Sequence, residues 1–148
     1  MNITENLKAV SQEAGWNIQD WQGMFKIDVD SDHGNWQTFC KVLEEEKRFC
    51  YYSLCPVNVP KEKIPYLAEV ITRINYGLKI GNFEMDYDTG ELHFKTYVDF
   101  LDEDDTVVRS AMLQCIYANT LTFDNYFSKI MQAIHGNQED REEFMKSL

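Results

Sequence analysis

The sequence predicts an α+β domain, in which an antiparallel sheet of about five strands packs with helices in the order α-β-β-β-α-β-β-α. Three stretches carry apolar residues at helical spacing, and five alternate apolar and polar residues as half-buried strands do. Groups of strands separated by helices favour an antiparallel sheet that the helices cover. The chain has 148 residues, of which 44% are hydrophobic, and this is enough to bury a core of its own.

The first part of the chain is interpreted as a helix followed by a three-stranded meander. The helix is expected over residues 2–14, because Gly15 is a suitable C-terminal cap. Asp32-His33-Gly34-Asn35 has the composition of a turn. The strands are expected at residues 24–30, 36–43 and 48–54.

The rest of the chain is interpreted as a helix, a hairpin and a helix. The first of these helices ends at Gly77, and Pro65 fits its first turn, where a missing N–H costs little. The hairpin is expected to turn at Asp88-Thr89-Gly90. Residues 106–135 form one helix, or two if Asn119-Thr120 breaks the pattern.

We expect one domain, residues 1–136, followed by a polar acidic C-terminal tail, residues 137–148. The N-terminus has no cationic region followed by an apolar run, so we do not interpret it as a signal peptide. No window approaches the 18 apolar residues of a membrane span. The expected location is therefore cytoplasmic.

The charge balance argues against nucleic acid and membranes as partners. The chain has 25 acidic and 14 basic residues, which gives a net charge of −11. Phosphate groups require a basic face, and repulsion would slow encounter with DNA or an anionic membrane. The expected partner is another protein.

The four cysteines, Cys40, Cys50, Cys55 and Cys115, are interpreted as cytosolic thiols rather than a disulfide framework. One alternative stays open. Cys40 and Cys50 would face each other across a hairpin if its loop is Glu44 to Glu46, and they could then form a disulfide in an oxidising compartment.

The chain contains no motif that supports catalysis or metal binding. Asp28-Val29-Asp30-Ser31-Asp32 is similar to the start of an EF-hand loop, but His33 and Phe39 stand where that loop needs Gly and Glu. Asp88-Thr89-Gly90 matches the aspartic-protease tripeptide, although a hairpin turn explains its glycine. The histidines and cysteines lack zinc-site spacing. We therefore expect no catalytic residue, no metal and no cofactor.

Aromatic residues are the one compositional excess, and some of them are candidates for contact with a partner. Tyr51 and Tyr52 are adjacent, so their side chains lie on opposite faces of the sheet. Trp36 and Phe39 are three positions apart in one predicted strand, so their side chains also lie on opposite faces. An aromatic face without covering helices would be a natural interface, so these four residues are the candidate partner-binding set. In the alternative interpretation, helices or the N-terminal segment cover both faces.

The stretch from Arg73 to Asp86, followed by Thr89-Gly90-Glu91-Leu92, resembles the YbjN family of small bacterial proteins, described as sensory transduction regulators. The resemblance covers roughly residues 5–135. It implies the type III secretion chaperone-like fold, whose members are small, acidic, often dimeric proteins that bind other proteins. The residues that carry it are Asn75, Tyr76, Gly81, Asn82, Phe83 and Gly90.

These signature residues are interpreted mainly as structural. Glycine permits backbone conformations that a side chain would forbid, and the Asn82 amide is expected to satisfy turn N–H groups. Tyr76 and Phe83 are expected to pack on the sheet. The leading hypothesis is a non-enzymatic cytoplasmic protein-binding domain, a regulator or chaperone-like adaptor, which the resemblance implies is a homodimer. The alternative is a small-molecule sensor or small enzyme with a pocket between the sheet and the last helix.

Overall fold

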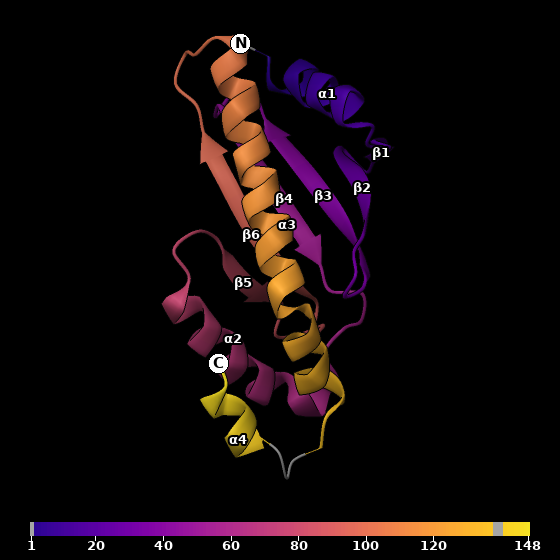
Figure 1. The fold of residues 1–148 in the computed structure, drawn as a ribbon, viewed down its shortest axis with the longest axis vertical. Helices are drawn as coiled ribbons and strands as arrows, with labels where there is room; N and C mark the ends of the chain where they lie inside the picture. The colour runs from indigo at the N-terminus through magenta and orange to yellow at the C-terminus, as the bar shows by residue number, and fades with distance from the viewer. Residues whose placement is uncertain (1, 138–140) are drawn as a thin grey trace.

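The chain folds into helices and strands close to the predicted order (Figure 1). The computed structural model describes residues 2–137 and 141–148. The helices are α1 (Ile3–Ala14), α2 (Ile64–Gly77), α3 (Asp105–His135) and α4 (Arg141–Lys146), with a 3-10 turn at Lys61–Lys63 before α2. The strands are β1 (Gln19–Trp21), β2 (Met24–Asp30), β3 (Asn35–Leu43), β4 (Arg48–Leu54), β5 (Asn82–Met85) and β6 (Leu92–Asp99).

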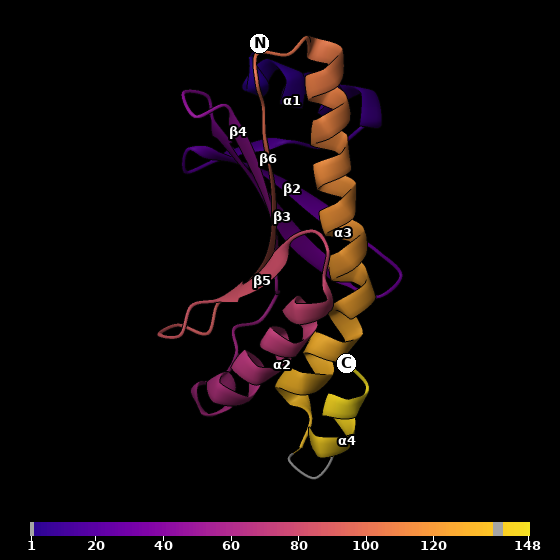
Figure 2. The same cartoon turned by 90° about the vertical axis from the view of Figure 1, so that its left-hand side faces the viewer.

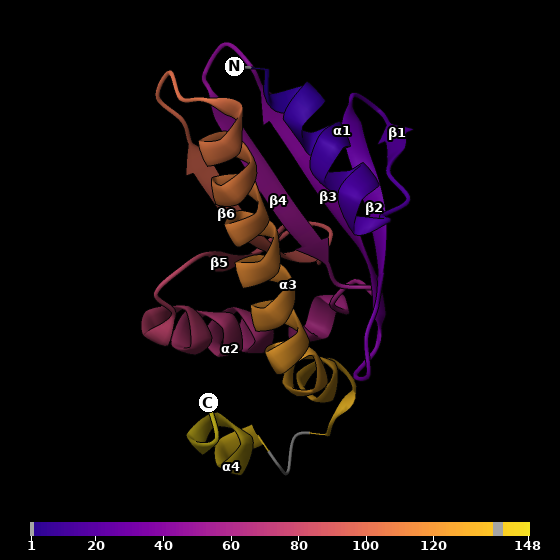
Figure 3. The same ribbon diagram turned by 45° about the horizontal axis from the view of Figure 1, so that its top comes forward.

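Across the described ranges, six strands form one antiparallel sheet in the order β1-β2-β3-β4-β6-β5. The long helix α3 runs over one face of this sheet, and α1 lies beside it on the same face (Figure 3). Helix α2 packs at the end of the sheet near β5, and α4 lies next to α2 (Figure 1). The predicted α+β class with an antiparallel sheet and helices is confirmed.

Strand β1 is the sheet element that the sequence interpretation missed. Its three residues are all exposed, so they show no alternation of apolar and polar side chains. A two-residue turn, Gln22-Gly23, joins β1 to β2, with both residues at positive φ (48° and 80°). Turns of this kind match the twist of the two strands that they connect, so the turn rather than the burial pattern defines this hairpin.

The core has two parts, and α3 contributes to both. One part lies between the sheet, α1 and the first half of α3, and includes Leu7, Phe49 and Met112. The other lies between the sheet, α2 and the second half of α3, and includes Leu67 and Phe123. Each large side chain that leaves water in this way contributes about 1.5–3 kcal/mol, so α3 fastens the two ends of the sheet together.

Helix α3 is continuous, so the possible break at Asn119-Thr120 is not present. Its N-cap is Asp104, whose carboxylate accepts a hydrogen bond from the backbone N–H of Val107 at 3.0 Å. At its other end, Lys63 Nζ donates to the backbone carbonyls of Ile134 and Gly136. Side chains therefore form hydrogen bonds with free backbone groups at both ends of α3, and the apolar side of the helix packs on the sheet.

The hairpin between β3 and β4 excludes a Cys40–Cys50 disulfide. Its loop has four residues, Glu44–Lys47, and pairs Cys40 with Tyr51, while Cys50 lies opposite Lys41. One extra loop residue shifts the register by one, and a one-residue shift moves a side chain to the other face of the sheet. Cys40 consequently lies under the helices and Cys50 on the opposite face, and all four cysteines are free thiols.

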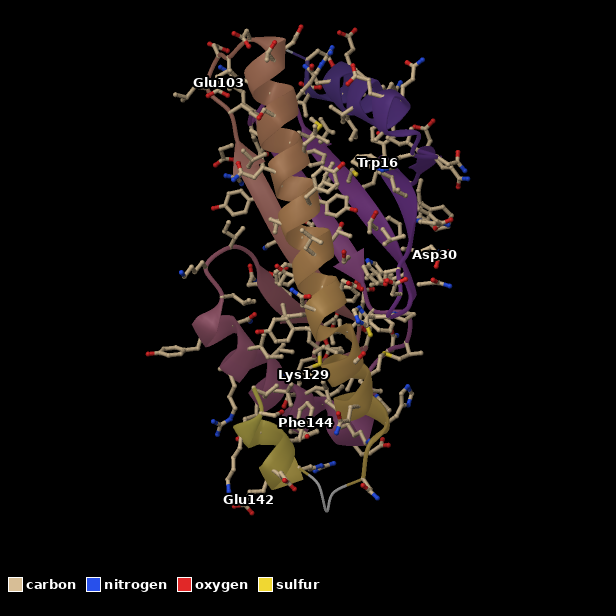
Figure 4. All side chains as sticks on the ribbon, in the orientation of Figure 1. Trp16, Asp30, Glu103, Lys129, Glu142 and Phe144 are labelled. Atoms are coloured by element: carbon tan, nitrogen blue, oxygen red, sulfur yellow. The ribbon has the colours of Figure 1, made fainter. Side chains whose placement is uncertain are left out.

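The C-terminal segment contributes a side chain to the core. Helix α4 carries Phe144, which is 7% exposed and belongs to the same apolar cluster as α2 and the end of α3. Figure 4 shows Phe144 where α4 meets these helices. Residues 138–140 of the predicted tail, and Met1, lie outside the described residues.

Candidate functional site

One face of the sheet is left open. In the described parts of the chain, α1 and α3 cover a single face, and Figure 2 shows α3 on one side of the strands with the opposite side of the sheet uncovered. The interpretation in which helices cover both faces is therefore wrong. We call the uncovered side the open face, and it is formed by the outward side chains of the strands, which include Met24, Lys26, Asp28, Asp30, Asn35, Gln37, Phe39, Lys41, Arg48, Cys50, Tyr52, Leu54, His93, Lys95, Tyr97 and Asp99.

A row of paired residues crosses the centre of the open face. Phe39 on β3 lies opposite Tyr52 on β4, so the two aromatic rings are cross-strand neighbours. Lys26 on β2 lies opposite Phe39, and Lys95 on β6 lies opposite Tyr52. The register thus gives the open face an aromatic centre with a lysine on each side.

The two aromatic residues of this row, Phe39 and Tyr52, form the floor of a groove of about 430 Å³. The β1–β2 hairpin forms one wall, where Trp21 is 45% exposed and its ring lies 5.6 Å from Lys26 Nζ. The other wall is β6, where the His93 and Tyr52 rings pack in a T-shaped arrangement with their centroids 5.1 Å apart. The residues that line the groove are Trp21, Met24, Gln37, Phe39, Tyr52, Leu54, Glu91 and His93.

Charged groups at the β6 side of the groove form a hydrogen-bonded cluster. Glu84 Oε1 lies 2.8 Å from His93 Nε2, and Glu84 Oε2 accepts a hydrogen bond from Lys95 Nζ at 3.0 Å. Burial raises the pKa of the Glu84 carboxyl, but its bonds to His93 and Lys95 outweigh burial and hold that pKa below its usual value. Burial raises the pKa of Tyr52 to about 12, so its hydroxyl stays protonated and can donate.

The structure divides the four predicted partner-binding residues between the two faces. Phe39 and Tyr52 lie on the open face and line the groove. Trp36 and Tyr51 are 4% and 1% exposed and lie beneath the helices, so neither side chain is available to a partner. Trp36 packs against the ring of Phe123 at 4.9 Å. The predicted set is therefore corrected to Phe39 and Tyr52. The alternation along a strand shows that two residues lie on opposite faces, but it does not show which face the helices cover.

The signature around the end of α2 is structural at most of its positions. Asn75 Oδ1 accepts from the backbone N–H of Phe83 at 2.8 Å, and Asn75 Nδ2 donates to the Phe83 carbonyl at 3.0 Å. Asn75 thereby fastens α2 to β5, and it is Asn75 rather than Asn82 that satisfies backbone groups here. Phe83 is 2% exposed, as predicted. Tyr76 is 95% exposed, so the prediction that it packs on the sheet is wrong.

Two signature glycines stand where a side chain would not fit. Gly81 has φ +77°, and a Cβ there would lie 2.8 Å from the carbonyl oxygen of Lys95. Gly90 has φ +78°, and a Cβ there would collide with the carbonyl oxygen of Val59. At Gly90, the hairpin and the segment before α2 therefore approach each other so closely that only glycine is tolerated.

The sequence interpretation missed a buried polar network on the covered face. Trp36 Nε1 donates to Ser53 Oγ at 3.1 Å, and Ser53 Oγ donates to Asn119 Oδ1 at 2.7 Å. Asn119 Nδ2 in turn donates to the backbone carbonyls of Tyr51 and Phe94 at 2.9 and 3.0 Å. The signal available in the sequence was the single amide of Asn119 within the apolar stripe of a helix. Its hydrogen bonds join α3 to β4 and β6.

A second pocket, of about 280 Å³, lies between the sheet and α3. Its walls include Trp16 after α1, Ile27 and Tyr51 of the sheet, and Ile116 and Tyr117 of α3. Figure 4 shows Trp16 beside α1. This pocket occupies the place in which the alternative hypothesis expected a small molecule.

Groups that could support chemistry are arranged differently from a catalytic site. Ser31 Oγ donates to Asp124 Oδ1 at 2.7 Å, and His33 Nδ1 lies 3.0 Å from the same oxygen, so the carboxylate separates the hydroxyl from the imidazole. Burial raises the pKa of Cys115 to about 11. Within residues 2–137 and 141–148, no three His, Cys, Asp or Glu side chains are placed to hold a metal ion. None of the helices described is long and apolar enough to cross a membrane.

Comparison with known proteins gives distant likenesses. No family model matches the sequence, so the YbjN resemblance stays a prediction. No curated protein matches it either. Among solved structures, the chain is similar to one in the HopA1–SchA chaperone–effector complex, with a TM-score of 0.46, 14% identity, and coverage of 82% of this chain and 89% of that chain. It is also similar to a chain in the ExsC–ExsE complex, with a TM-score of 0.45, 9% identity, and coverage of 83% and 91%. Because both TM-scores are below 0.5, the description of the fold rests on this chain's own elements.

Proposed function

We propose that this chain is a non-enzymatic protein-binding domain that holds its partner on the open face of its sheet. The observation that supports the proposal is the aromatic groove across that face. Protein interfaces place aromatic side chains at their centre and charged groups at their rim. The groove has this order, with Phe39 and Tyr52 on its floor and Lys26 and Lys95 on either side.

The role that we propose is that of a regulator or chaperone-like adaptor in the cytoplasm. The net charge of −11 favours a protein over a polyanion as partner. All four cysteines are free and buried, which suits a reducing compartment. Association of two copies stays a prediction, which sedimentation velocity of the wild-type chain tests.

The partner is expected to depend on Phe39. A pull-down from the native cytoplasm with the wild-type chain should retain one protein in near-stoichiometric amount. Phe39→Asp removes the aromatic ring at the centre of the groove and should abolish retention, because central aromatic side chains carry much of the binding energy of an interface and a buried carboxylate costs free energy. Leu121, which is 62% exposed on α3, supplies the matched control: Leu121→Asp should retain the same protein.

Folding of each variant is verified first by circular dichroism and thermal unfolding. If Phe39→Asp folds and retains the same protein as the wild type, the open face is not the binding site. Loss of the protein with Leu121→Asp alone would move the site to the helical side of the molecule.

A second candidate function is binding of a small molecule in the pocket between β2 and α3. The pocket is lined by aromatic rings and aliphatic side chains together with Asp28 and Asp30, and the Tyr51 hydroxyl lies 3.4 Å from Thr120 Oγ1 at its edge. A metabolite at about 100 times its dissociation constant would stabilise the fold by about 2.7 kcal/mol, which a thermal-shift screen detects. Thr120→Phe should fill the pocket and remove the shift, whereas a shift that persists would locate the ligand elsewhere.

A further inference from the structure

One edge of the sheet is unpaired beside the pocket between β2 and α3. Strand β1 pairs with β2 only as far as Lys26, so residues 27–30 of β2 have no neighbouring strand on that side. On their other side, these residues pair with β3. The unpaired part includes Asp28 and Asp30, and both residues line the pocket. The pocket therefore borders a free strand edge as well as apolar side chains.

The register shows which backbone groups face this edge. The residues of an antiparallel strand direct their N–H and C=O groups alternately to one side and to the other. Ser31, just after β2, donates its N–H to the carbonyl of Gly34, just before β3, at 2.9 Å. Counting back by two, Val29 also bonds to β3, so the backbone groups of Asp28 and Asp30 point to the free edge. The carbonyl of Asp28 and the N–H of Asp30 are thus an acceptor and a donor beside each other.

The free edge is short, which favours a small molecule over a strand of a partner. At one end the edge meets β1, and at the other the chain turns at Ser31, whose hydroxyl donates to Asp124 on α3 at 2.7 Å. Residues 27–30 span about 13 Å at about 3.3 Å each, whereas a typical strand spans about 17–20 Å. A ring that forms two hydrogen bonds with the backbone fits within this length.

The walls of the pocket suit a flat ring. The rings of Trp16 and Tyr117 line it, inclined at 73° with their centroids 6.0 Å apart, and Ile27 and Ile116 add aliphatic surface. The volume of about 280 Å³ is just below the range of about 300–1,000 Å³ that is usual for ligand pockets. One ring or two fused rings therefore fit this volume better than a larger molecule.

The charge at the pocket disfavours an anionic ligand. Among the described residues that line it, the charged ones are Asp28 and Asp30, and both are acidic. The whole chain has a net charge of −11, so a phosphate group would be repelled. A free base fits these charges, whereas a nucleotide does not.

Resting on the second candidate function, a small molecule in this pocket, we infer that the ligand is a neutral planar heterocycle with an N–H donor beside a ring-nitrogen acceptor, as in an aminopurine. The donor of the ligand bonds to the carbonyl of Asp28, and its acceptor receives the N–H of Asp30. The ring lies against Trp16 and Tyr117, where stacking adds to the two hydrogen bonds.

Adenine is the probe that tests this class of ligand, because its amino group and a neighbouring ring nitrogen present the required donor and acceptor. The control is the analogue with two methyl groups on the amino nitrogen, which keeps the ring and loses the donor. By isothermal titration calorimetry, we expect adenine to bind with a dissociation constant below about 1 mM, and the control at least about tenfold more weakly. A weaker constant for adenine, or equal constants for the two compounds, would overturn the inference.

Two substitutions at one position separate the backbone contact from the side chain. Asp30→Pro removes the N–H that faces the free edge and leaves the bonds to β3, and proline is tolerated at such edge positions. Asp30→Ala keeps the N–H and removes only the carboxylate. Adenine should bind Asp30→Ala as tightly as the wild-type chain, and Asp30→Pro about tenfold more weakly. Equal affinities for the two folded variants would contradict the backbone contact.

Hydrogen exchange of the wild-type chain tests the same contact without any substitution, so a Pro variant that fails to fold leaves the inference testable. Circular dichroism and thermal unfolding first verify both variants. Saturating adenine should slow exchange of the Asp30 amide, because that N–H becomes hydrogen-bonded. The amide of Val29 already bonds to β3 and should keep its rate. An unchanged rate at Asp30 with adenine bound would overturn the inference.

Failure of this inference is distinguishable from failure of the functions proposed above. If a metabolite gives a thermal shift that Thr120→Phe removes, while adenine does not bind, the pocket takes a small molecule of another class. If a captured protein, and not adenine, slows exchange of the Asp30 amide, a strand of a partner covers this edge, and the inference is overturned. The protein-binding function of the open face is tested separately at Phe39.

Discussion

Replacement of Asn119 by alanine is expected to lower the free energy of unfolding by about 3 kcal/mol, because several buried polar groups lose their partner together. The side chain is fully buried, and it accepts from Ser53 and donates to the carbonyls of Tyr51 and Phe94. Alanine cannot form any of these bonds and leaves space that water does not readily fill. Urea unfolding measures the loss, and the midpoint of thermal unfolding should fall by about 6–12 °C.

Asn125 supplies the matched control for this substitution. It is also an asparagine on α3, but its side chain is exposed. Asn125→Ala should change stability by less than about 0.5 kcal/mol, the usual range for surface positions. If the two alanine variants were equally stable, the buried network would contribute little, and apolar contacts alone would hold α3 on the sheet.

The second large effect is expected at Gly90, where alanine should lower the free energy of unfolding by about 4 kcal/mol. Two costs combine at this position. The residue has φ +78°, a left-handed conformation that disfavours a side chain. The new methyl group would also meet the backbone of Val59, whose N–H donates to the Gly90 carbonyl at 2.8 Å. Because the obstacle is backbone, the β5–β6 turn must move away from the segment before α2.

Gly15 separates these two costs. It caps α1 at φ +74°, and no atom lies within 4 Å of the position that a Cβ would take. Gly15→Ala should therefore lose only the conformational term, about 1 kcal/mol. Chemical denaturation of both variants gives the difference. Equal losses would contradict the close approach of the hairpin to Val59.

Local periodicity predicted most of the secondary structure correctly. Strands β2, β3 and β4 and helices α1 and α2 lie where alternation or helical spacing placed them, because burial of one side repeats with the period of the element. Each exception has an identifiable cause. Strand β1 is exposed throughout, and the turn predicted at Asp88-Thr89-Gly90 begins one residue earlier, at Tyr87, which is 62% exposed. Asn119 looked like a helix breaker because its partners are distant in the sequence.

The candidate site was only partly visible in the sequence. The alternation of side chains along a strand placed Tyr51 and Tyr52 on opposite faces of the sheet, and likewise Trp36 and Phe39. The structure confirms both placements. Trp21, Glu91 and His93 also line the groove, although they come from segments far from Phe39 along the chain. Their proximity depends on strand order, in which β6 inserts beside β4. The residues of one strand do not by themselves determine which strand pairs beside it.

The sequence by itself determined the α+β class, the positions of most elements, the reading of Cys55 and Cys115 as thiols, and the acidic character of the chain. These properties depend on composition and on repeats within a few residues. Only the tertiary structure decided which sheet face the helices cover, the register that separates Cys40 from Cys50, and the assembly of the groove. A one-residue shift in register exchanges the faces of a strand, and the choice between faces is made by helices that pack from elsewhere in the chain.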